Sequence, residues 1–170
     1  MLPPINFSKW IEDNRAALKP PVGNKCIYED PDFIIMVVGG PNIRSDFHVN
    51  QTSEFFYQVE GDITLKVREK SDVRDIVIKE GEMFLLPPRV PHSPQRPENT
   101  VGLVIERKRK EGEKDGFIWY CDGCGAKVYD HFFELKDIVK QLPPIFAEFY
   151  DNEANSTCKA CGMRQKRRQN

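Results

Sequence analysis

The feature that most constrains the fold of this chain is a series of short apolar runs between residues 33 and 107. Each run is rich in β-branched or aromatic residues, and glycine, proline or charged residues separate it from the next. Short strands at this regular spacing are typical of an all-β sandwich or barrel. We therefore predict a mainly β fold. Its strands are expected in FIIMVVGG (33–40), EFFYQVEG (54–61), ITLKVRE (63–69), DIVIKEGE (75–82), MFLLPP (83–88) and VGLVIER (101–107).

Helical patterns precede and follow this β region in the sequence. Residues 7–18, FSKWIEDNRAAL, place their apolar side chains on one helical face, and Ser8 is a suitable N-cap. Near the other end, residues 132–142 have a helical pattern that Pro143 and Pro144 would break, and a second amphipathic stretch follows.

A charged run, RKRKEGEKDG at residues 107–116, predicts the border of the β region. It contains two glycines, and we interpret it as a solvated linker without a functional role. We therefore expect two parts. Residues 1–110 would form a catalytic β barrel with its N-terminal helix, and residues 111–170 would form a small metal-binding segment packed on the barrel.

Charge and hydropathy exclude several classes of partner. The formal net charge of −1 gives no general attraction to nucleic acid or to anionic membranes. No apolar run approaches the roughly 20 residues of a membrane span, and the N-terminal residues lack the apolar core of a signal peptide. We therefore predict a cytoplasmic protein without nucleic-acid or membrane partners. Thiols stay reduced in that compartment, so the five cysteines are interpreted as metal ligands or free thiols.

Two of the three histidines suggest a metal site in the β region. His48 precedes Glu54 by six positions, an even step that would put both side chains on one face of a strand. Two imidazoles and one carboxylate are typical ligands of iron sites that bind both a substrate and O2. For His48 and Glu54 alone, a surface histidine and a surface acid are the commoner interpretation. The wider spacing pattern favours the metal.

That spacing pattern resembles the two sequence motifs of the cupin superfamily over residues 30–107. Gly61 follows Glu54 by seven positions, while Pro87 lies six positions after Gly81 and five before His92, which we place in a proline-rich turn. The resemblance implies a cupin double-stranded β-helix, or jelly-roll barrel, with a metal inside it.

Asn50 is the main departure from the cupin pattern, because many cupins have a second histidine of the first motif at this position. The remaining ligand set is His48, Glu54 and His92. Three protein ligands leave three positions of an octahedral ion open. Such a site suits a reaction in which a chelating substrate and O2 share one metal.

Two arginines and a glutamate extend the site. Arg44 and Arg96 each lie four positions from one of the two histidines, and paired guanidinium groups bind a planar carboxylate through charge-assisted hydrogen bonds. The alternative is that both are surface arginines. Glu106 lies in an apolar strand and points away from Leu103 and Ile105, where an unpaired carboxylate would be costly.

Five motifs in order resemble the 3-hydroxyanthranilate 3,4-dioxygenase family, in the short bacterial and fungal form that carries a C-terminal rubredoxin-like segment. They are LKPPVGN, VVGGPN.R.D.H, EFFYQ.EG, EG..FLLPP.VPHSPQRPE and LVIER. The resemblance implies a homodimeric enzyme of the kynurenine pathway, acting towards either NAD or tryptophan catabolism. Its reaction would be Fe(II)-dependent extradiol cleavage of 3-hydroxyanthranilate by O2, giving 2-amino-3-carboxymuconate semialdehyde.

The same resemblance implies the role of each site residue. His48, Glu54 and His92 would hold the catalytic iron. Arg44 and Arg96 would bind the substrate carboxylate. Glu106 would contact the hydroxyl or amino group at the metal and accept the phenolic proton.

A second metal site is predicted from the cysteines. Cys121-x-x-Cys124 and Cys158-x-x-Cys161 each end in glycine, and this spacing lets four thiolates surround one tetrahedral ion. A closed tetrathiolate site has no open position, so we expect a structural role. The spacing alone does not separate iron from zinc, although CDGCG and CKACG resemble rubredoxin knuckles, which favours iron.

Two other functions are compatible with parts of the sequence. One is a zinc-ribbon protein that binds nucleic acid through the cysteines and the basic tail RQKRRQN, although the ribbon lacks basic residues interleaved with aromatic ones. The other is a cupin with a different small-molecule reaction, such as a thiol dioxygenase or a sugar isomerase. The arginine pair and the missing fourth ligand disfavour it.

Overall fold

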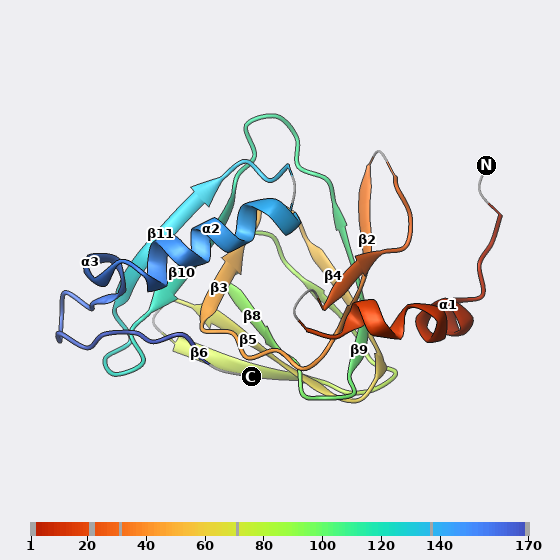
Figure 1. The fold of residues 1–170 in the computed structure, drawn as a ribbon, viewed down its shortest axis with the longest axis horizontal. Coiled ribbons are helices and arrows are strands. Elements are labelled where there is room, and N and C mark those ends of the chain that lie inside the picture. Colours follow the sequence, from red (N-terminus) through yellow and green to blue (C-terminus); the bar gives the residue numbers. More distant parts are fainter. Residues whose placement is uncertain (1–2, 21–22, 31, 71, 137, 169–170) are drawn as a thin grey trace.

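The computed structural model describes residues 3–20, 23–30, 32–70, 72–136 and 138–168. Within these residues the body of the molecule is a barrel of two antiparallel sheets (Figure 1). The five-stranded sheet has the order β1-β2-β9-β4-β7. Its strands are β1 (Asn24–Cys26), β2 (Phe33–Gly39), β9 (Val101–Arg107), β4 (Glu54–Glu60) and β7 (Met83–Leu86).

The six-stranded sheet has the order β11-β10-β3-β8-β5-β6. Its strands are β11 (Lys127–Phe133), β10 (Asp115–Tyr120), β3 (Asp46–Val49), β8 (His92–Gln95), β5 (Ile63–Glu69) and β6 (Asp72–Ile78). The predicted mainly β fold is confirmed, and a strand occupies or overlaps each of the six predicted runs. The sequence did not predict β3 and β8, which are only four residues long. Both carry residues of the expected metal site.

Side chains from both sheets fill the barrel. Along β5, Ile63, Leu65 and Val67 are buried and alternate with partly exposed residues, as expected for a strand with one face on the core. Each such buried aliphatic side chain contributes about 1.5–3 kcal/mol. The core cluster consists of Met36, Phe56, Ile63, Leu65, Val67, Ile78, Leu86 and Val104.

The N-terminal helix covers the outer face of the five-stranded sheet. It comprises α1 (Phe7–Asn14) and the 3₁₀ turn η1 (Arg15–Leu18). Ile11 and Leu18 are buried there against Val37 of β2. The predicted cap was wrong, because Asn6, not Ser8, accepts the backbone N–H of Lys9 at 3.0 Å.

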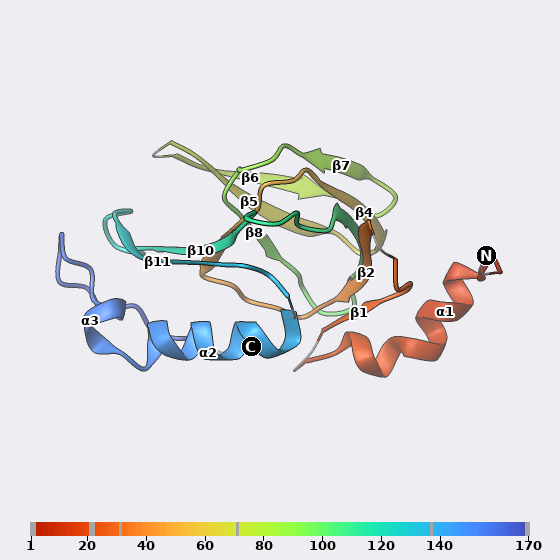
Figure 2. The same cartoon turned by 90° about the horizontal axis from the view of Figure 1, so that it is seen from above.

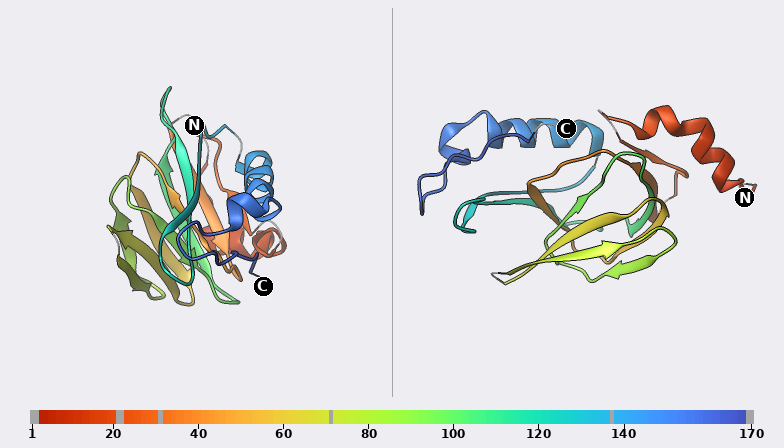
Figure 3. Two further views of the ribbon diagram at one scale, coloured as in Figure 1. Left: turned by 90° about the vertical axis from the view of Figure 1, so that its left-hand side faces the viewer. Right: turned by 90° about the horizontal axis from the view of Figure 1, so that it is seen from below.

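The C-terminal helices are α2 (Ile138–Tyr150) and α3 (Glu153–Ser156). The prediction of a helix over 132–142 was wrong, because residues 132 and 133 belong to β11 and α2 continues through Pro143 and Pro144. Packing on β10 explains this, since Ile145 and Phe149 of α2 are buried against Trp119. Tertiary packing of an apolar face outweighs local propensity. Both α1 and α2 lie on the same side of the barrel, opposite β6 and β7 (Figures 2 and 3).

The charged run at 107–116 is not a solvated linker as predicted. The side chains of Arg109 and Asp115 are only 5% and 1% exposed, and they pair with one another. Mutual pairing makes the burial of both charges tolerable, which a count of charges along the sequence does not reveal. The six-stranded sheet also continues past residue 110, because β10 pairs with β3. The division at residue 110 remains a prediction about how the chain is organised.

Among the described residues, no helix is both long and apolar enough to cross a membrane.

Candidate active site and metal centres

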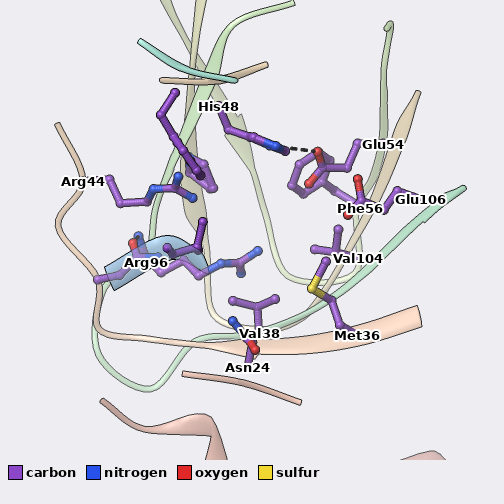
Figure 4. A pocket seen from close by; sticks show the side chains of 14 residues that line it. Asn24, Met36, Val38, Arg44, His48, Glu54, Phe56, Arg96, Val104 and Glu106 are labelled. Carbon is purple, nitrogen blue, oxygen red and sulfur yellow. Dashed lines mark hydrogen bonds and ion pairs between the residues drawn. The ribbon is translucent and has the colours of Figure 1, made fainter. Parts of the chain in front are cut away.

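Strand pairing brings the three expected metal ligands together inside the barrel. His48 on β3 lies directly opposite His92 on β8. Glu54 begins β4 on the facing sheet, and its carboxylate is 3.0 Å from Nε2 of His92. The same carboxylate is 4.0 Å from Nδ1 of His48 (Figure 4). Their potential ligand atoms all lie within 4.8 Å of one another. The expectation that His92 lies in a turn was wrong, because it is the first residue of β8.

Each histidine of this triad has one ring nitrogen fixed by a neighbour. Nε2 of His48 donates to the carboxylate of Asp115 at 2.7 Å, and Nδ1 of His92 donates to the carbonyl of Val90 at 3.0 Å. Both partners are acceptors, so the opposite nitrogens, which face Glu54, are left with lone pairs. Histidines that bind metals usually have this arrangement, in which the second N–H is held by a carboxylate or carbonyl.

Two members of the triad, His48 and Glu54, line a small cavity of about 120 Å³. Its apolar wall comes from both the barrel and the C-terminal segment, because Phe117 of β10 and Leu142 of α2 line it together with Phe56. The sequence did not predict these contributions from beyond residue 110. The lining residues are Asn24, Met36, Val38, Asn42, Arg44, His48, Glu54, Phe56, Pro94, Arg96, Val104, Glu106, Phe117 and Leu142.

Arg96 is a buried cation with few partners. The residue is 2% exposed, and among the described residues its Nε has no hydrogen-bond partner, while Nη1 makes one long contact of 3.4 Å to Gln58. Burial lowers the pKa of Arg96 to about 10. A buried guanidinium without an anion is costly, so this side chain is suited to bind an anionic group that enters the cavity.

Arg44 also lines the cavity but is paired within the chain. Its guanidinium contacts the buried carboxylate of Asp46, with Nε at 3.1 Å from one oxygen. Burial alone would lower the pKa of Arg44, but the charge of Asp46 outweighs it and the pKa is raised. The two arginines therefore differ. Arg44 is paired directly with a carboxylate, whereas Arg96 has no direct ion-pair partner among the described residues and is only partly offset by the charge of Glu54.

Glu106 lies beside the triad, because β9 and β4 pair with Glu106 directly opposite Glu54. Burial, followed by the nearby charge of Glu54, raises the pKa of Glu106 to about 7. Asn50 donates to Oε2 of Glu106 at 2.8 Å and is 3.4 Å from Oε2 of Glu54. The position where many cupins have a histidine therefore holds an amide that links two carboxylates.

Two residues near the site were not predicted from the sequence. Arg109 contacts Glu106 at 2.8 Å, and Asp115 contacts the ring of His48. Their position in a charged run concealed them. The apolar run GFIWY directly after Asp115 could have indicated the position of Asp115, because the run predicts a strand and Asp115 stands at the start of that strand.

The charges around the triad fit a divalent cation. Three buried carboxylates, those of Glu54, Glu106 and Asp115, are accompanied by the guanidinium groups of Arg109 and Arg96, while Arg44 and Asp46 neutralise each other. With neutral histidines and ionised acids the sum is −3 + 2 = −1. Two imidazole nitrogens and a carboxylate oxygen are suitable ligands for a first-row divalent metal. The triad is therefore a candidate metal site.

The four cysteines form a second candidate metal site. Their sulfurs lie within 4.8 Å of one another, with Cys121 3.5 Å from Cys161 and Cys124 3.6 Å from Cys158. Sulfurs of a tetrahedral site with 2.3 Å metal–sulfur bonds would be about 3.8 Å apart, so the arrangement suits one ion. The glycine after each pair has positive φ, 72° at Gly125, which the tight turn requires.

Comparisons with known proteins point to one family. The family model described as 3-hydroxyanthranilic acid dioxygenase matches residues 1–150. A 3-hydroxyanthranilate 3,4-dioxygenase from Xanthomonas euvesicatoria pv. vesicatoria is 54% identical over 162 residues, covering 95% of this chain and 92% of that protein. One from Jannaschia sp. is 52% identical over 159 residues, covering 93% of this chain and 88% of that protein.

Among solved structures, the fold is similar to a cupin-2 domain containing protein from Shewanella frigidimarina. The TM-score is 0.49 and the sequence identity is 24%, over 61% of this chain and 93% of that chain.

Proposed function

Because the chain belongs to the 3-hydroxyanthranilic acid dioxygenase family, we propose that it cleaves the ring of 3-hydroxyanthranilate with O2 to give 2-amino-3-carboxymuconate semialdehyde. One observation carries the proposal beyond the family. His48 and Glu54 of the candidate metal site line the same small cavity as Arg96, a buried cation without a direct ion-pair partner among the described residues. This combination suits a substrate that is both a metal chelator and a carboxylate.

The substrate carboxylate would bind to Arg96 and lie near Arg44. Arg96 lines the cavity and has no direct ion-pair partner among the described residues, so an entering carboxylate would meet a buried, charged donor. Arg44 already pairs with Asp46, so it would add hydrogen-bond donors near the carboxylate but little net charge. The pair would fix the orientation of the ring relative to the triad, and thereby determine which bond breaks.

The triad of His48, Glu54 and His92 would hold iron. Iron there would supply the one-electron chemistry by which O2 reacts with an aromatic ring. Glu106 would accept the proton of the ring hydroxyl, since a carboxyl group with a pKa of about 7 exchanges protons readily at neutral pH. The net change would break the ring carbon–carbon bond next to the hydroxyl-bearing carbon and place both oxygen atoms in the product.

The apolar wall of the cavity would exclude water from the reacting groups. Phe56, Val104 and Phe117 offer no hydrogen bonds to a ring placed against them. A dry site also strengthens the interaction of each charged group with the substrate.

The test is turnover by iron-loaded protein. We expect O2 uptake and the absorbance of a ring-opened semialdehyde when 3-hydroxyanthranilate is added to the Fe(II)-loaded protein under air. As a control, benzoate lacks both donor groups for the metal and should not be consumed. Absence of turnover by protein that has bound Fe(II) would contradict the proposal.

The four-cysteine site would hold iron or zinc in a structural role, because a tetrathiolate ion has no open position for a substrate. We also propose a cytoplasmic location, which the absence of a disulfide among the described cysteines supports, since reducing compartments keep thiols from pairing.

The protein is further proposed to be a homodimer. Phe33, Met83 and Leu85 are 48%, 68% and 62% exposed on the five-stranded sheet, and Phe33 and Leu85 line the same shallow depression. Exposed apolar groups of this kind are commonly covered by a partner. Light scattering coupled to size exclusion should give about twice the 19.7 kDa chain mass.

A further inference from the structure

One buried arginine connects the two sides of the candidate active site. The side chain of Arg109 is 5% exposed, and it follows β9 at the point where the chain turns towards β10. All three of its guanidinium nitrogens have partners. Nη1 is 2.8 Å from Oε2 of Glu106, while Nε and Nη2 lie 2.6 Å and 2.5 Å from the two oxygens of Asp115.

The contact with Glu106 determines which of its oxygens is available. Both Nη1 of Arg109 and Nδ2 of Asn50 bond to the same oxygen, Oε2. The other oxygen, Oε1, is therefore left to act on a ligand in the cavity, which Glu106 lines. A carboxylate held by two donors on one oxygen has little freedom to rotate.

The contact with Asp115 reaches the other side of the site. Oδ2 of Asp115 also accepts the Nε2 proton of His48 at 2.7 Å. This carboxylate sets the ring orientation of His48, and the two-pronged contact with Arg109 sets the orientation of the carboxylate. Asp115 is 1% exposed, so solvent does not replace either bond.

We propose that Arg109 is a positioning residue for ring cleavage, holding Glu106 and, through Asp115, the ring of His48 in one rigid arrangement. This rests on the proposed function, in which Glu106 accepts a proton and His48 holds iron. A lysine at this position would keep the charge but could not contact both carboxylates through a planar fork. The shape of the guanidinium group is thus as important as its charge.

The experiment compares Arg109→Gln, Arg109→Lys and Asp115→Asn with the wild-type enzyme. For Arg109→Gln, we expect kcat to fall by about 100-fold, since proton transfer by a positioned group contributes that much or more. The dissociation constant of 3-hydroxyanthranilate, measured without O2, should change less than about 3-fold, because Arg44 and Arg96 are untouched. Arg109→Lys should recover part of the lost kcat.

Iron affinity is the second measurement. Asp115→Asn should weaken Fe(II) binding at the triad by about 10- to 100-fold, as expected when the hydrogen-bond partner of a ligand histidine is altered. Competition with a chelating dye measures this without turnover. Arg107→Gln is the matched control, because Arg107 pairs with Glu113 at 2.7 Å on the outer side of the barrel. It should behave as wild type in every assay.

The outcomes separate a positioning role from a merely structural one. A normal kcat in Arg109→Gln would overturn the inference. So would an equal loss of iron affinity, substrate affinity and thermal stability in both Arg109→Gln and Arg109→Lys. If Arg109→Gln does not fold, the kcat of Arg109→Lys and the iron affinity of Asp115→Asn test the positioning role. Wild-type protein that binds Fe(II) without turning over 3-hydroxyanthranilate would instead contradict the proposed function. The iron affinity of Asp115→Asn would still test whether Asp115 positions His48.

Discussion

A single glycine on β9 makes room for Arg96, the arginine that we propose binds the substrate. A Cβ atom at Gly102 would lie 2.8 Å from Nη1 of Arg96 and 2.8 Å from Oε1 of Gln58. Both distances are too short for unbonded atoms, but both neighbours are the ends of flexible side chains. An alanine here would therefore displace the guanidinium without preventing the fold.

The Gly102→Ala variant should bind substrate less well. We expect the KM for 3-hydroxyanthranilate to rise by about 10-fold with a smaller change in kcat, because a misplaced guanidinium loses part of a charge-assisted hydrogen bond. Adding Gln58→Ala should relieve the crowding and lower KM again. Steady-state kinetics of the single and double variants tests this, and an unchanged KM in Gly102→Ala would contradict it.

Arg96 itself should lower stability while it permits binding. In Arg96→Leu we expect a KM at least about 10-fold higher, since a charged hydrogen bond contributes about 1.5–3 kcal/mol. The melting temperature should stay the same or rise, because an uncompensated buried charge is replaced by an apolar group. Arg74→Leu, which removes the exposed pair with Glu69, is the control. A lower melting temperature with normal KM would show that Arg96 is structural.

At the level of elements, the C-terminal helix α2 is held to the barrel by aromatic packing on β10. Phe149 is fully buried, and its ring stacks on Trp119 at 4.4 Å between centroids with an interplanar angle of 19°. Leu142 on the same helix lines the candidate active site. The packing that holds α2 on the sheet therefore also holds one wall of the cavity.

Removing this contact should destabilise the protein strongly. Phe149→Ala is expected to lower the free energy of unfolding by about 3–5 kcal/mol, the usual cost of deleting a buried phenylalanine. Phe132→Ala on the adjacent β11 is the matched control, and should cost no more than about 1 kcal/mol because that ring is 46% exposed. Urea unfolding of both variants measures the difference, and equal losses would contradict this account of the packing.

At the level of the whole molecule, the described residues contain two separate clusters of potential metal ligands, and the two clusters differ in their ligand types. One has two imidazoles and a carboxylate inside the barrel, and the other has four thiolates outside it. The first leaves positions open for exogenous ligands, whereas the second is closed. Metal should therefore be removable from each site independently.

Metal analysis of purified variants tests this independence. Protein loaded with metal should contain about two ions per chain, and His92→Ala and Cys158→Ser should each lose about one. Only His92→Ala should lose activity directly, while Cys158→Ser should mainly lower the melting temperature. Cys26→Ser is the control, because this exposed thiol lies outside both clusters and should leave both ions in place. Loss of both ions in either variant would show that the sites are coupled.

The sequence by itself determined the class of fold and the residue types of the site. Alternating apolar residues can bury one face only as strands, and paired cysteine knuckles can surround an ion with little help from the rest of the chain. His48, Glu54 and His92, together with Glu106 and the two arginines, were all identified from motifs. The structure brings all of them except His92 to the lining of one cavity, and it places His92 beside His48 and Glu54.

Only the tertiary structure decided how these groups are supported and neutralised. Strand pairing placed Glu106 opposite Glu54 and brought Asp115 to His48 across 67 residues. Whether a charged residue is solvated or buried depends on which partner the fold brings to it, and Arg109 and Arg44 show this most clearly. Charge along the chain is a local property, whereas its compensation is set by distance in space.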